Sequence, residues 1–275
     1  MSAPDPISPR TALCGIVLHP AGHTRSPAMH NAAFRALGLD AVYLAFDVLP
    51  EALRDAVAGA RALGVRQLAV SLPHKQAVMA HLDEVEETAR RIGAVNTVTR
   101  SPEGRLVGAN TDWIGAVRAL ERELELAGAR AVVLGAGGAA RGVVYGLLAR
   151  GARVTVLDRT PGRARALADD LGAEGAGPLS ELARVPHDVL VNATSLGLSG
   201  DVSPVPAEAL RPATLVMDTI YEPERTRLLR DAEARGARTL GGKWMLVHQA
   251  AEQLRIWSGR EAPLERMAEA FDRAG

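Results

Sequence analysis

Apolar and polar positions along the chain follow two different periods. Short runs rich in β-branched and other apolar residues predict buried strands, and between them apolar residues recur at helical spacing. This strand and helix rhythm is typical of an α/β protein. In the first third of the chain, strands are predicted over 11–18, 41–48 and 65–72, and helices from Ser26-Pro27 onward and over 51–63.

The pattern changes between residues 94 and 109. Two short extended segments there are separated by Ser101-Pro-Glu-Gly104, a turn sequence that predicts a hairpin. A helix over 113–127 follows, and we expect it to connect two domains.

The remainder of the chain predicts a second α/β arrangement. Further strand-like runs favour a doubly wound parallel sheet, and from Lys243 the pattern is helical to the end of the chain. The predicted strands begin at 131 and run over 152–158, 188–194 and 214–221, with a helix over 143–150; the apolar face of the last region holds Leu246, Ala250, Leu254 and Trp257.

A glycine-rich turn, Gly135-Ala136-Gly137-Gly138-Ala139, ends the strand that begins at 131. In dinucleotide-binding turns the first glycine allows the tight turn, and the second lets the backbone approach a pyrophosphate. Ala140 stands where such turns take a small residue for helix packing. Asp158 ends the next strand, 23 residues beyond Gly135, at the acidic position of the fingerprint. The segment therefore predicts a nucleotide site at a helix N-terminus.

Charge and cysteine content narrow the class of protein. The 275 residues carry 32 basic and 32 acidic side chains, so no excess of positive charge indicates a nucleic-acid or membrane partner. The single cysteine, Cys14, lies in an apolar run, which excludes a disulfide framework and predicts buried packing in a reducing compartment. Neither a signal-peptide core nor an apolar stretch of membrane-spanning length is present. We expect a cytoplasmic protein with a small-molecule substrate.

Lys75 is the first candidate for chemistry. Only Lys75 and Lys243 are lysines, and every other basic residue is an arginine. A partly desolvated lysine can exchange its proton near neutral pH, whereas a guanidinium cannot. Lys75 follows a predicted parallel strand at its C-terminal end, where open α/β sheets place their sites, whereas Lys243 is interpreted as a surface lysine.

Two further groups could act with this lysine. Asp112 could orient the ammonium and bind a substrate hydroxyl, although Thr111 or Asp112 could equally cap the helix that follows. Thr24 and Ser26 precede the Pro27 helix, so both hydroxyls could face one anion such as a carboxylate; the alternative is that Ser26 only caps this helix. The seven histidines lack metal-ligand spacing, and no metal site is expected.

Together these stretches resemble the shikimate dehydrogenase family over nearly the whole chain. Seven strings carry the resemblance, in the order in which the family has them. They are Thr24-Arg-Ser-Pro27, Leu72-Pro-His-Lys75, Gly93-Ala-Val-Asn-Thr97, Asn110-Thr-Asp112, Gly135-Ala-Gly-Gly-Ala139, Asn192-Ala-Thr-Ser195 and Met245-Leu-Val-His-Gln249.

The resemblance implies reversible reduction of 3-dehydroshikimate to shikimate with NADPH, in aromatic amino-acid biosynthesis. It implies a discontinuous α/β catalytic domain over 1–112 and 241–275, and a Rossmann-type nucleotide domain over 113–240. Lys75 and Asp112 would be the catalytic pair. Thr24, Ser26, Ser71, Asn96, Tyr221 and Gln249 would bind the substrate, and Gly135, Ala136, Gly137, Gly138, Ala139, Asp158, Arg159, Thr160, Arg163, Thr194 and Gly242 would bind the cofactor.

Four positions depart from the family pattern. The family usually has Ser at 24, Asn at 69 and Thr at 71, where this chain has Thr24, Ala69 and Ser71, so quinate becomes a conceivable substrate. Asp158-Arg159-Thr160 replaces Asn-Arg-Thr, which leaves use of NAD beside NADP open. A quinate/shikimate dehydrogenase that uses NAD, and a non-catalytic nucleotide sensor, are therefore the alternatives. A monomer and a homodimer are both compatible with the sequence.

Overall fold

The computed structural model describes residues 7–274. The chain forms two compact units. The first comprises the described residues of Met1–Thr111 and Gln249–Gly275, and the second comprises Asp112–His248. The sequence predicts a substrate-binding domain over 1–112 and 241–275 and a cofactor-binding domain over 113–240. These functional assignments stay a prediction.

The first unit is built on a six-stranded mixed sheet with the order β2-β1-β3-β5-β6-β4. β1 is parallel to β2 and β3, whereas β5 is antiparallel to both β3 and β6. The β5–β6 pair is the predicted hairpin. The strands are β1 (Ala12–Leu18), β2 (Ala41–Asp47), β3 (Gln67–Val70), β4 (Glu84–Val85), β5 (Thr97–Arg100) and β6 (Leu106–Ala109).

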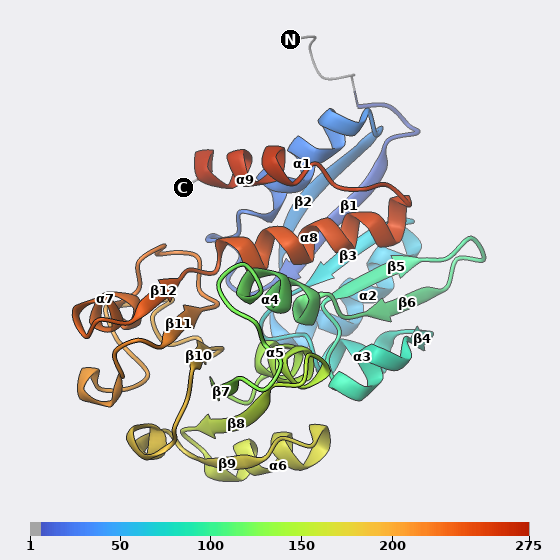
Figure 1. The fold of residues 1–275 in the computed structure, drawn as a ribbon. Helices are drawn as coiled ribbons and strands as arrows, with labels where there is room; N and C mark the ends of the chain where they lie inside the picture. The colour runs from blue at the N-terminus through green and yellow to red at the C-terminus, as the bar shows by residue number, and fades with distance from the viewer. Residues whose placement is uncertain (1–6, 275) are drawn as a thin grey trace. The chain divides into compact units, whose positions relative to one another are not determined.

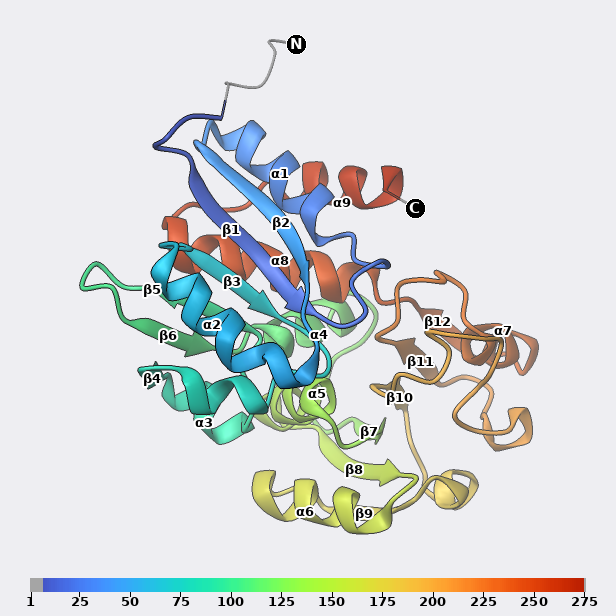
Figure 2. The same cartoon turned by 180° about the vertical axis from the view of Figure 1, so that it is seen from behind.

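Helices cover both faces of this sheet. α8 crosses one face and α2 lies on the other, as Figures 1 and 2 show from opposite sides. Val57 and Ala60 of α2 pack with strand residues in a buried cluster. The helices of this unit are α1 (Ser26–Leu37), α2 (Leu53–Ala62), α3 (Glu87–Ile92), the part of α8 (Lys243–Ser258) from Gln249 onward and α9 (Leu264–Arg273), with short 3₁₀ turns at Pro50–Ala52 and Ala77–His81.

The second unit contains an all-parallel six-stranded sheet. Its order is β12-β11-β10-β7-β8-β9, so the first strand of the unit lies between the second and the fourth, as in a Rossmann fold. The expected α/β class with a doubly wound parallel sheet is confirmed. The strands are β7 (Arg130–Leu134), β8 (Arg153–Asp158), β9 (Gly175–Pro178), β10 (Val189–Asn192), β11 (Leu215–Asp218) and β12 (Arg238–Leu240).

Both faces of this parallel sheet are buried. Ala131 and Val133 of β7 face one apolar cluster, whereas Val132 and Leu134 face another, which explains the unbroken apolar run in the sequence. The first cluster includes residues of α4 (Asp112–Leu120), α5 (Gly138–Ala149) and α6 (Pro161–Leu171), and the second includes residues of α7 (Arg227–Ala234) and of the 3₁₀ turns Leu179–Arg184 and Ala207–Ala209.

Two predicted helices differ from the observed ones. The helix expected over 113–127 ends at Leu120, and the chain continues in turns in which the Glu123 and Leu124 N–H groups both donate to the Leu120 carbonyl oxygen. The C-terminal helical region is divided after Ser258, where Gly259 has a φ of +68°. Within the described residues no helix is long and apolar enough to span a bilayer.

Cys14 and His30 are buried within the first unit. Burial raises the pKa of the Cys14 thiol to about 12, so the thiol stays protonated, as a packing role requires. His30 on α1 stacks on Tyr43 with a ring-centroid distance of 4.1 Å and an interplanar angle of 1°. Burial lowers the pKa of His30 to about 3, and the Gln253 side chain has a smaller, opposing effect.

His30 should make the protein sensitive to acid. The unfolded chain takes up a proton on this imidazole below about pH 6.5, whereas the folded protein does so only near pH 3, so stability falls as the pH decreases between these values. We expect His30→Gln to reduce the slope of unfolding free energy against pH between 6 and 4, by up to about 1.4 kcal/mol per pH unit.

Urea unfolding at a series of pH values measures this slope. The same substitution at His81, which is not buried, controls for the change from histidine to glutamine. Equal slopes for wild type and His30→Gln would show that His30 does not carry the effect.

Candidate active site

Four segments meet at one edge of the first unit's sheet. Because β1 and β3 are parallel, the segments that follow them leave at the same edge. β5 is antiparallel to both β3 and β6, with Thr97 paired to Ala69 and to Ala109, so β5 begins and β6 ends at that edge. This register places the segments after β1 and β3 beside Asn96 and the residues that follow β6.

Asn96 is the centre of a buried hydrogen-bond cluster at this edge. Its side-chain NH₂ group donates to Thr111 Oγ1 at 3.0 Å and to Gln249 Oε1 at 3.2 Å. Its side-chain oxygen accepts from the Thr97 hydroxyl at 2.8 Å and from the Thr111 backbone N–H at 2.7 Å. The structure thus brings together Asn96 and Gln249, two predicted substrate-binding residues that are far apart in the sequence, and adds Thr111 to them.

The backbone around Lys75 is held at several points. The Lys75 carbonyl oxygen accepts from the Val95 N–H at 2.8 Å, next to Asn96. The buried His74 imidazole lies 2.8 Å from the Val48 carbonyl oxygen, and the His74 N–H donates to the Ser71 carbonyl oxygen at 2.9 Å. The Lys75 side chain is partly exposed. Ser71 and Lys75 therefore belong to one turn whose position is set by neighbouring segments.

Thr24 and Ser26 lie at the beginning of α1. The Ser26 N–H donates to Thr24 Oγ1 at 3.3 Å. The N-cap residue is Arg25, whose side chain makes no capping bond, so Ser26 does not have the capping role considered as its alternative. Ser26 is buried and Thr24 is partly buried. Both residues follow β1, at the same edge as Ser71 and Lys75.

Asp112 is the first residue of α4 and is buried. It follows Thr111 directly in the chain but is packed in the second unit. The predicted pairing of Asp112 with Lys75 joins residues of different units and stays a prediction.

The glycine turn of the second unit has the geometry of a ligand cradle. Gly135 has a φ of +105°, and a Cβ there would lie 3.0 Å from Thr194 Cγ2, so this position requires glycine. A Cβ on Gly137 would meet no protein atom of the described residues within 4 Å, so packing does not explain this glycine. Gly137 is also the N-cap of α5 and no side chain caps the helix. Open space beside a helix N-terminus suits a pyrophosphate.

Two exposed arginines and the N-terminus of α6 follow the end of β8. Asp158 Oδ1 accepts from the Thr160 N–H at 2.8 Å, so one carboxylate oxygen is committed to a turn. Thr160 is the N-cap of α6 and its side chain makes no capping bond. Arg159 and Arg163 are exposed, and neither forms an ion pair with another residue of the described chain. A phosphate could therefore meet two arginines and a helix N-terminus here.

Thr194, Tyr221 and Gly242 lie in the loops that follow β10, β11 and β12. Thr194 donates to Asn192 Oδ1 through its N–H at 3.0 Å and through its hydroxyl at 2.7 Å. The Gly242 N–H donates to the Ile220 carbonyl oxygen at 3.2 Å, next to Tyr221, and a Cβ on Gly242 would lie only 2.4 Å from the Thr219 carbonyl oxygen. Any larger residue at 242 would push the two loops apart.

Sequence reasoning missed several residues that organise these loops. Asn192 and Asp218 end the neighbouring strands β10 and β11, both are fully buried, and they bond to each other at 3.0 Å. Their signal in the sequence is a polar residue at the end of an apolar run, and it occurs twice. Gln253, one helical turn beyond Gln249, was also missed and donates to the Asn96 backbone carbonyl oxygen at 3.1 Å.

The Rossmann order, the glycine turn and the two arginines that follow β8 define a dinucleotide-binding α/β protein, the class that includes nicotinamide-dependent dehydrogenases. Three family profiles also match the chain. They are a shikimate dehydrogenase substrate binding domain over residues 16–98, shikimate / quinate 5-dehydrogenase over 117–198, and a shikimate 5'-dehydrogenase C-terminal domain over 242–270.

Individual proteins agree with these profiles. The shikimate dehydrogenase (NADP(+)) of Thermococcus kodakarensis is 50% identical over 255 residues, which cover 90% of this chain and 92% of that protein. The Thermus thermophilus shikimate 5-dehydrogenase in complex with NADP(H) and shikimate has a TM-score of 0.89 and 42% identity, covering 96% of this chain and 100% of that one. A Corynebacterium glutamicum quinate dehydrogenase in complex with NAD has a TM-score of 0.86 and 35% identity, covering 96% and 99%.

The chain therefore belongs to the shikimate dehydrogenase family. The resemblance inferred from the seven sequence strings is confirmed.

Proposed function

We propose that this protein is an oxidoreductase that interconverts shikimate and 3-dehydroshikimate with NADP(H). The observation that carries the proposal is 50% identity, over 90% of the chain, with a protein named shikimate dehydrogenase (NADP(+)). The substrate domain would comprise residues 1–112 and 241–275, and the nucleotide domain 113–240. A cytoplasmic location, and a monomeric or homodimeric state, belong to the same proposal.

The substrate would bind at the sheet edge where Asn96 and Gln249 meet. Thr24 and Ser26 would donate hydroxyl hydrogen bonds to the ring carboxylate, because both precede the same helix N-terminus. The ring hydroxyls would bind to Ser71, Asn96, Tyr221 and Gln249. The bond between Asn96 and Gln249 supports this role, since it orients both amides before a substrate arrives.

The cofactor would extend along the ends of β7, β8 and β10. The Gly135–Ala139 turn would hold the pyrophosphate, Arg159, Thr160 and Arg163 would hold the 2′-phosphate, and Thr194 and Gly242 would lie against the nicotinamide. When bound, the reduced nicotinamide supplies the hydride. The open space over Gly137 and the absence of ion pairs at Arg159 and Arg163 within the described chain support the fit.

Lys75 would supply the proton in the reduction. As the carbonyl carbon of 3-dehydroshikimate is reduced, its oxygen gains negative charge, and the Lys75 ammonium donates a proton to that oxygen. Asp112 would orient the ammonium and accept a hydrogen bond from a substrate hydroxyl. Proton transfer of this kind contributes about 10² to 10⁴ in rate.

Quinate oxidation with NAD is the second candidate, because the relative from Corynebacterium glutamicum is named quinate dehydrogenase and was solved with NAD. Initial rates with shikimate and with quinate, each with NADP⁺ and with NAD⁺, distinguish the candidates. We expect the highest kcat/KM for shikimate with NADP⁺. A higher value for quinate with NAD⁺ would favour the second candidate, and no turnover with any pair would favour a nucleotide sensor.

Replacing Lys75 tests the proposed proton transfer. We expect Lys75→Ala to lower kcat by about 10² to 10⁴ with a much smaller change in KM. Lys75→Arg should be similarly impaired, because a guanidinium keeps the charge but does not release a proton near neutral pH. Steady-state kinetics of both variants, with Lys243→Ala as a control for loss of a lysine, measure the effect. Near wild-type kcat in Lys75→Arg would leave Lys75 with only a charge-binding role.

Asp158 sets the cofactor preference in this proposal. Asp158→Asn keeps an oxygen that can accept from the Thr160 N–H, so the turn is preserved and only the charge is lost. Removing a carboxylate beside a 2′-phosphate should raise the ratio of kcat/KM for NADP⁺ to that for NAD⁺. Arg159→Ala should lower this ratio, because it removes a phosphate partner.

The two efficiencies are measured with shikimate held at saturation. The matched control is Arg184→Ala, which removes an exposed arginine of the same unit, in the 3₁₀ turn Leu179–Arg184, that has no proposed role. A ratio that is unchanged in Asp158→Asn would mean that the carboxylate does not face the ribose.

A further inference from the structure

A buried carboxylate outside the proposed catalytic pair connects three parts of the second unit. Asp218 ends β11 and has no exposed surface. Its Oδ1 accepts from Asn192 Nδ2 at 3.0 Å and from the Ile220 N–H at 3.0 Å, and its Oδ2 accepts from the Thr226 hydroxyl at 2.7 Å. Within residues 7–274 no basic side chain forms an ion pair with it.

The hydrogen bond from Asn192 to Asp218 fixes the orientation of the Asn192 side-chain amide, and with it the direction of the amide oxygen. Because the Asn192 NH₂ group is directed to Asp218, its oxygen is available to Thr194, from which it accepts two hydrogen bonds. The Thr194 methyl group in turn lies against the glycine turn at Gly135. Asp218 thus sets the loop after β10 without touching it.

Asp218 also accepts hydrogen bonds from both ends of the loop that contains Tyr221. The Ile220 N–H marks the beginning of this loop, and the Thr226 hydroxyl marks its end. Thr226 is also the N-cap of α7 and accepts from the Leu229 N–H at 3.4 Å. One carboxylate therefore closes the loop over 220–226, and the Ile220 carbonyl oxygen also accepts from Gly242.

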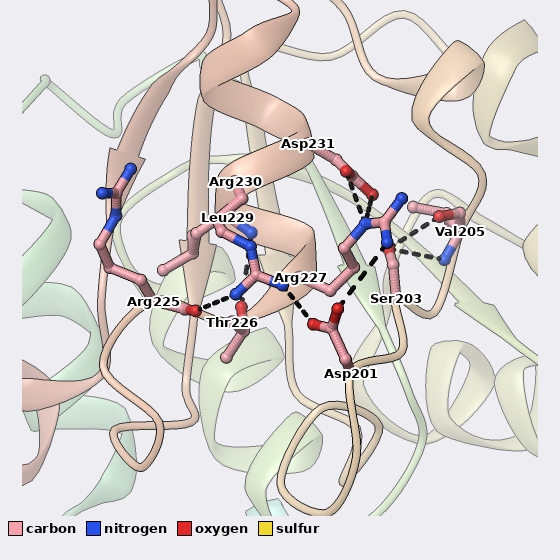
Figure 3. A network of polar contacts seen from close by, with 9 residues as sticks. All are labelled: Asp201, Ser203, Val205, Arg225, Thr226, Arg227, Leu229, Arg230 and Asp231. Carbon is pink, nitrogen blue, oxygen red and sulfur yellow. Dashed lines mark hydrogen bonds and ion pairs between the residues drawn. The ribbon is translucent and has the colours of Figure 1, made fainter.

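The first turn of α7 is held separately on its exposed side. Figure 3 shows Asp201 between the guanidinium groups of Arg227 and Arg230, with the Thr226 cap nearby. Arg227 also pairs with Asp231 at 2.7 Å. These exposed ion pairs link the helix to the loop around Asp201, whereas Asp218 bonds to the buried Thr226 hydroxyl.

A carboxylate suits this position better than an amide would. Three donors converge on its two oxygens, and an ionised carboxylate is purely an acceptor. An asparagine has only one acceptor oxygen. If that oxygen keeps the bonds from Asn192 and Ile220, its NH₂ group faces Thr226, whose hydroxyl can then no longer donate to it. Burial raises the pKa of Asp218 to about 6, so at neutral pH the group is predominantly ionised and can accept all three bonds. A buried charge without a cation is costly, and the hydrogen bonds from Ile220, Thr226 and Asn192 offset this cost only in part, which is why the pKa stays above its usual value.

We propose that Asp218 is a positioning residue for the nicotinamide end of the cofactor, acting through Asn192 on Thr194 and through Ile220 and Thr226 on the loop of Tyr221. This role rests on the proposed function, which places Thr194 and Gly242 against the nicotinamide. The adenosine end, at Asp158 and Arg159, lies outside this hydrogen-bond network.

The test compares a whole cofactor with a fragment of it. We expect Asp218→Asn to raise the dissociation constant of NADPH at least fivefold, and to change that of 2′,5′-ADP, which lacks the nicotinamide, by less than twofold. Asp188→Asn is the matched control. It loses a carboxylate that pairs with Arg130 just before the start of β10, so it should lower the unfolding temperature and leave both dissociation constants unchanged.

Thr226 supplies a second test should Asp218→Asn fail to fold. Thr226→Val removes the hydroxyl that donates to Asp218, whereas Thr226→Ser keeps it. We expect Val to weaken NADPH binding selectively and Ser to restore it. If Asp218→Asn and Thr226→Val leave both ligands unaffected, or weaken both by the same factor with a lower unfolding temperature, Asp218 has only a structural role.

Binding measurements keep this proposal separate from the proposed reaction. Protein that binds NADPH with the expected contrast but does not oxidise shikimate would contradict the reaction and support the role of Asp218. Protein that oxidises shikimate, but in which Asp218→Asn does not weaken NADPH binding more than 2′,5′-ADP binding, would support the reaction and contradict the role of Asp218.

Discussion

Parallel strand pairing is the constraint on which both units depend. When neighbouring strands run in the same direction, each connection must leave from the carboxyl end, so loops from distant parts of the chain collect at one edge. In the second unit this edge carries the glycine turn after β7, Asp158 at the end of β8 and the loops after β10 and β11. The first unit achieves the same result with a mixed sheet, because the antiparallel β5 begins where β3 ends.

Each edge is organised by one buried polar residue. Asn96 in the first unit and Asp218 in the second are almost or completely excluded from water, and each bonds to several segments at once. A buried polar group that loses a partner costs about 1 to 3 kcal/mol, so such a residue holds its neighbours to a narrow range of positions. The loops at these edges are consequently ordered by hydrogen bonds that a sequence pattern does not display.

At the end of β8, Asp158 has an observed role in a local turn and a proposed role in cofactor choice. Asp158 forms a turn with the Thr160 N–H, which any Asp or Asn at this position could form. Its charge matters only through the ribose that would lie beside it. The sequence identifies Asp158 and leaves open whether this strand end favours NAD or NADP. The structure adds that one carboxylate oxygen accepts a hydrogen bond from the Thr160 N–H.

The sequence by itself determined the α/β class and the strand and glycine turn at 131–139, because hydrophobic period and turn residues act over short distances. It indicated the family through the resemblance of seven short strings. It also predicted that Asn96 and Gln249 bind the substrate, but only by resemblance. The tertiary structure decided that these two side chains bond to each other, that α4 ends at Leu120, and that Asn192, Asp218 and Thr226 form one network. These partners are separated along the chain, and only strand order and register bring them within hydrogen-bonding distance.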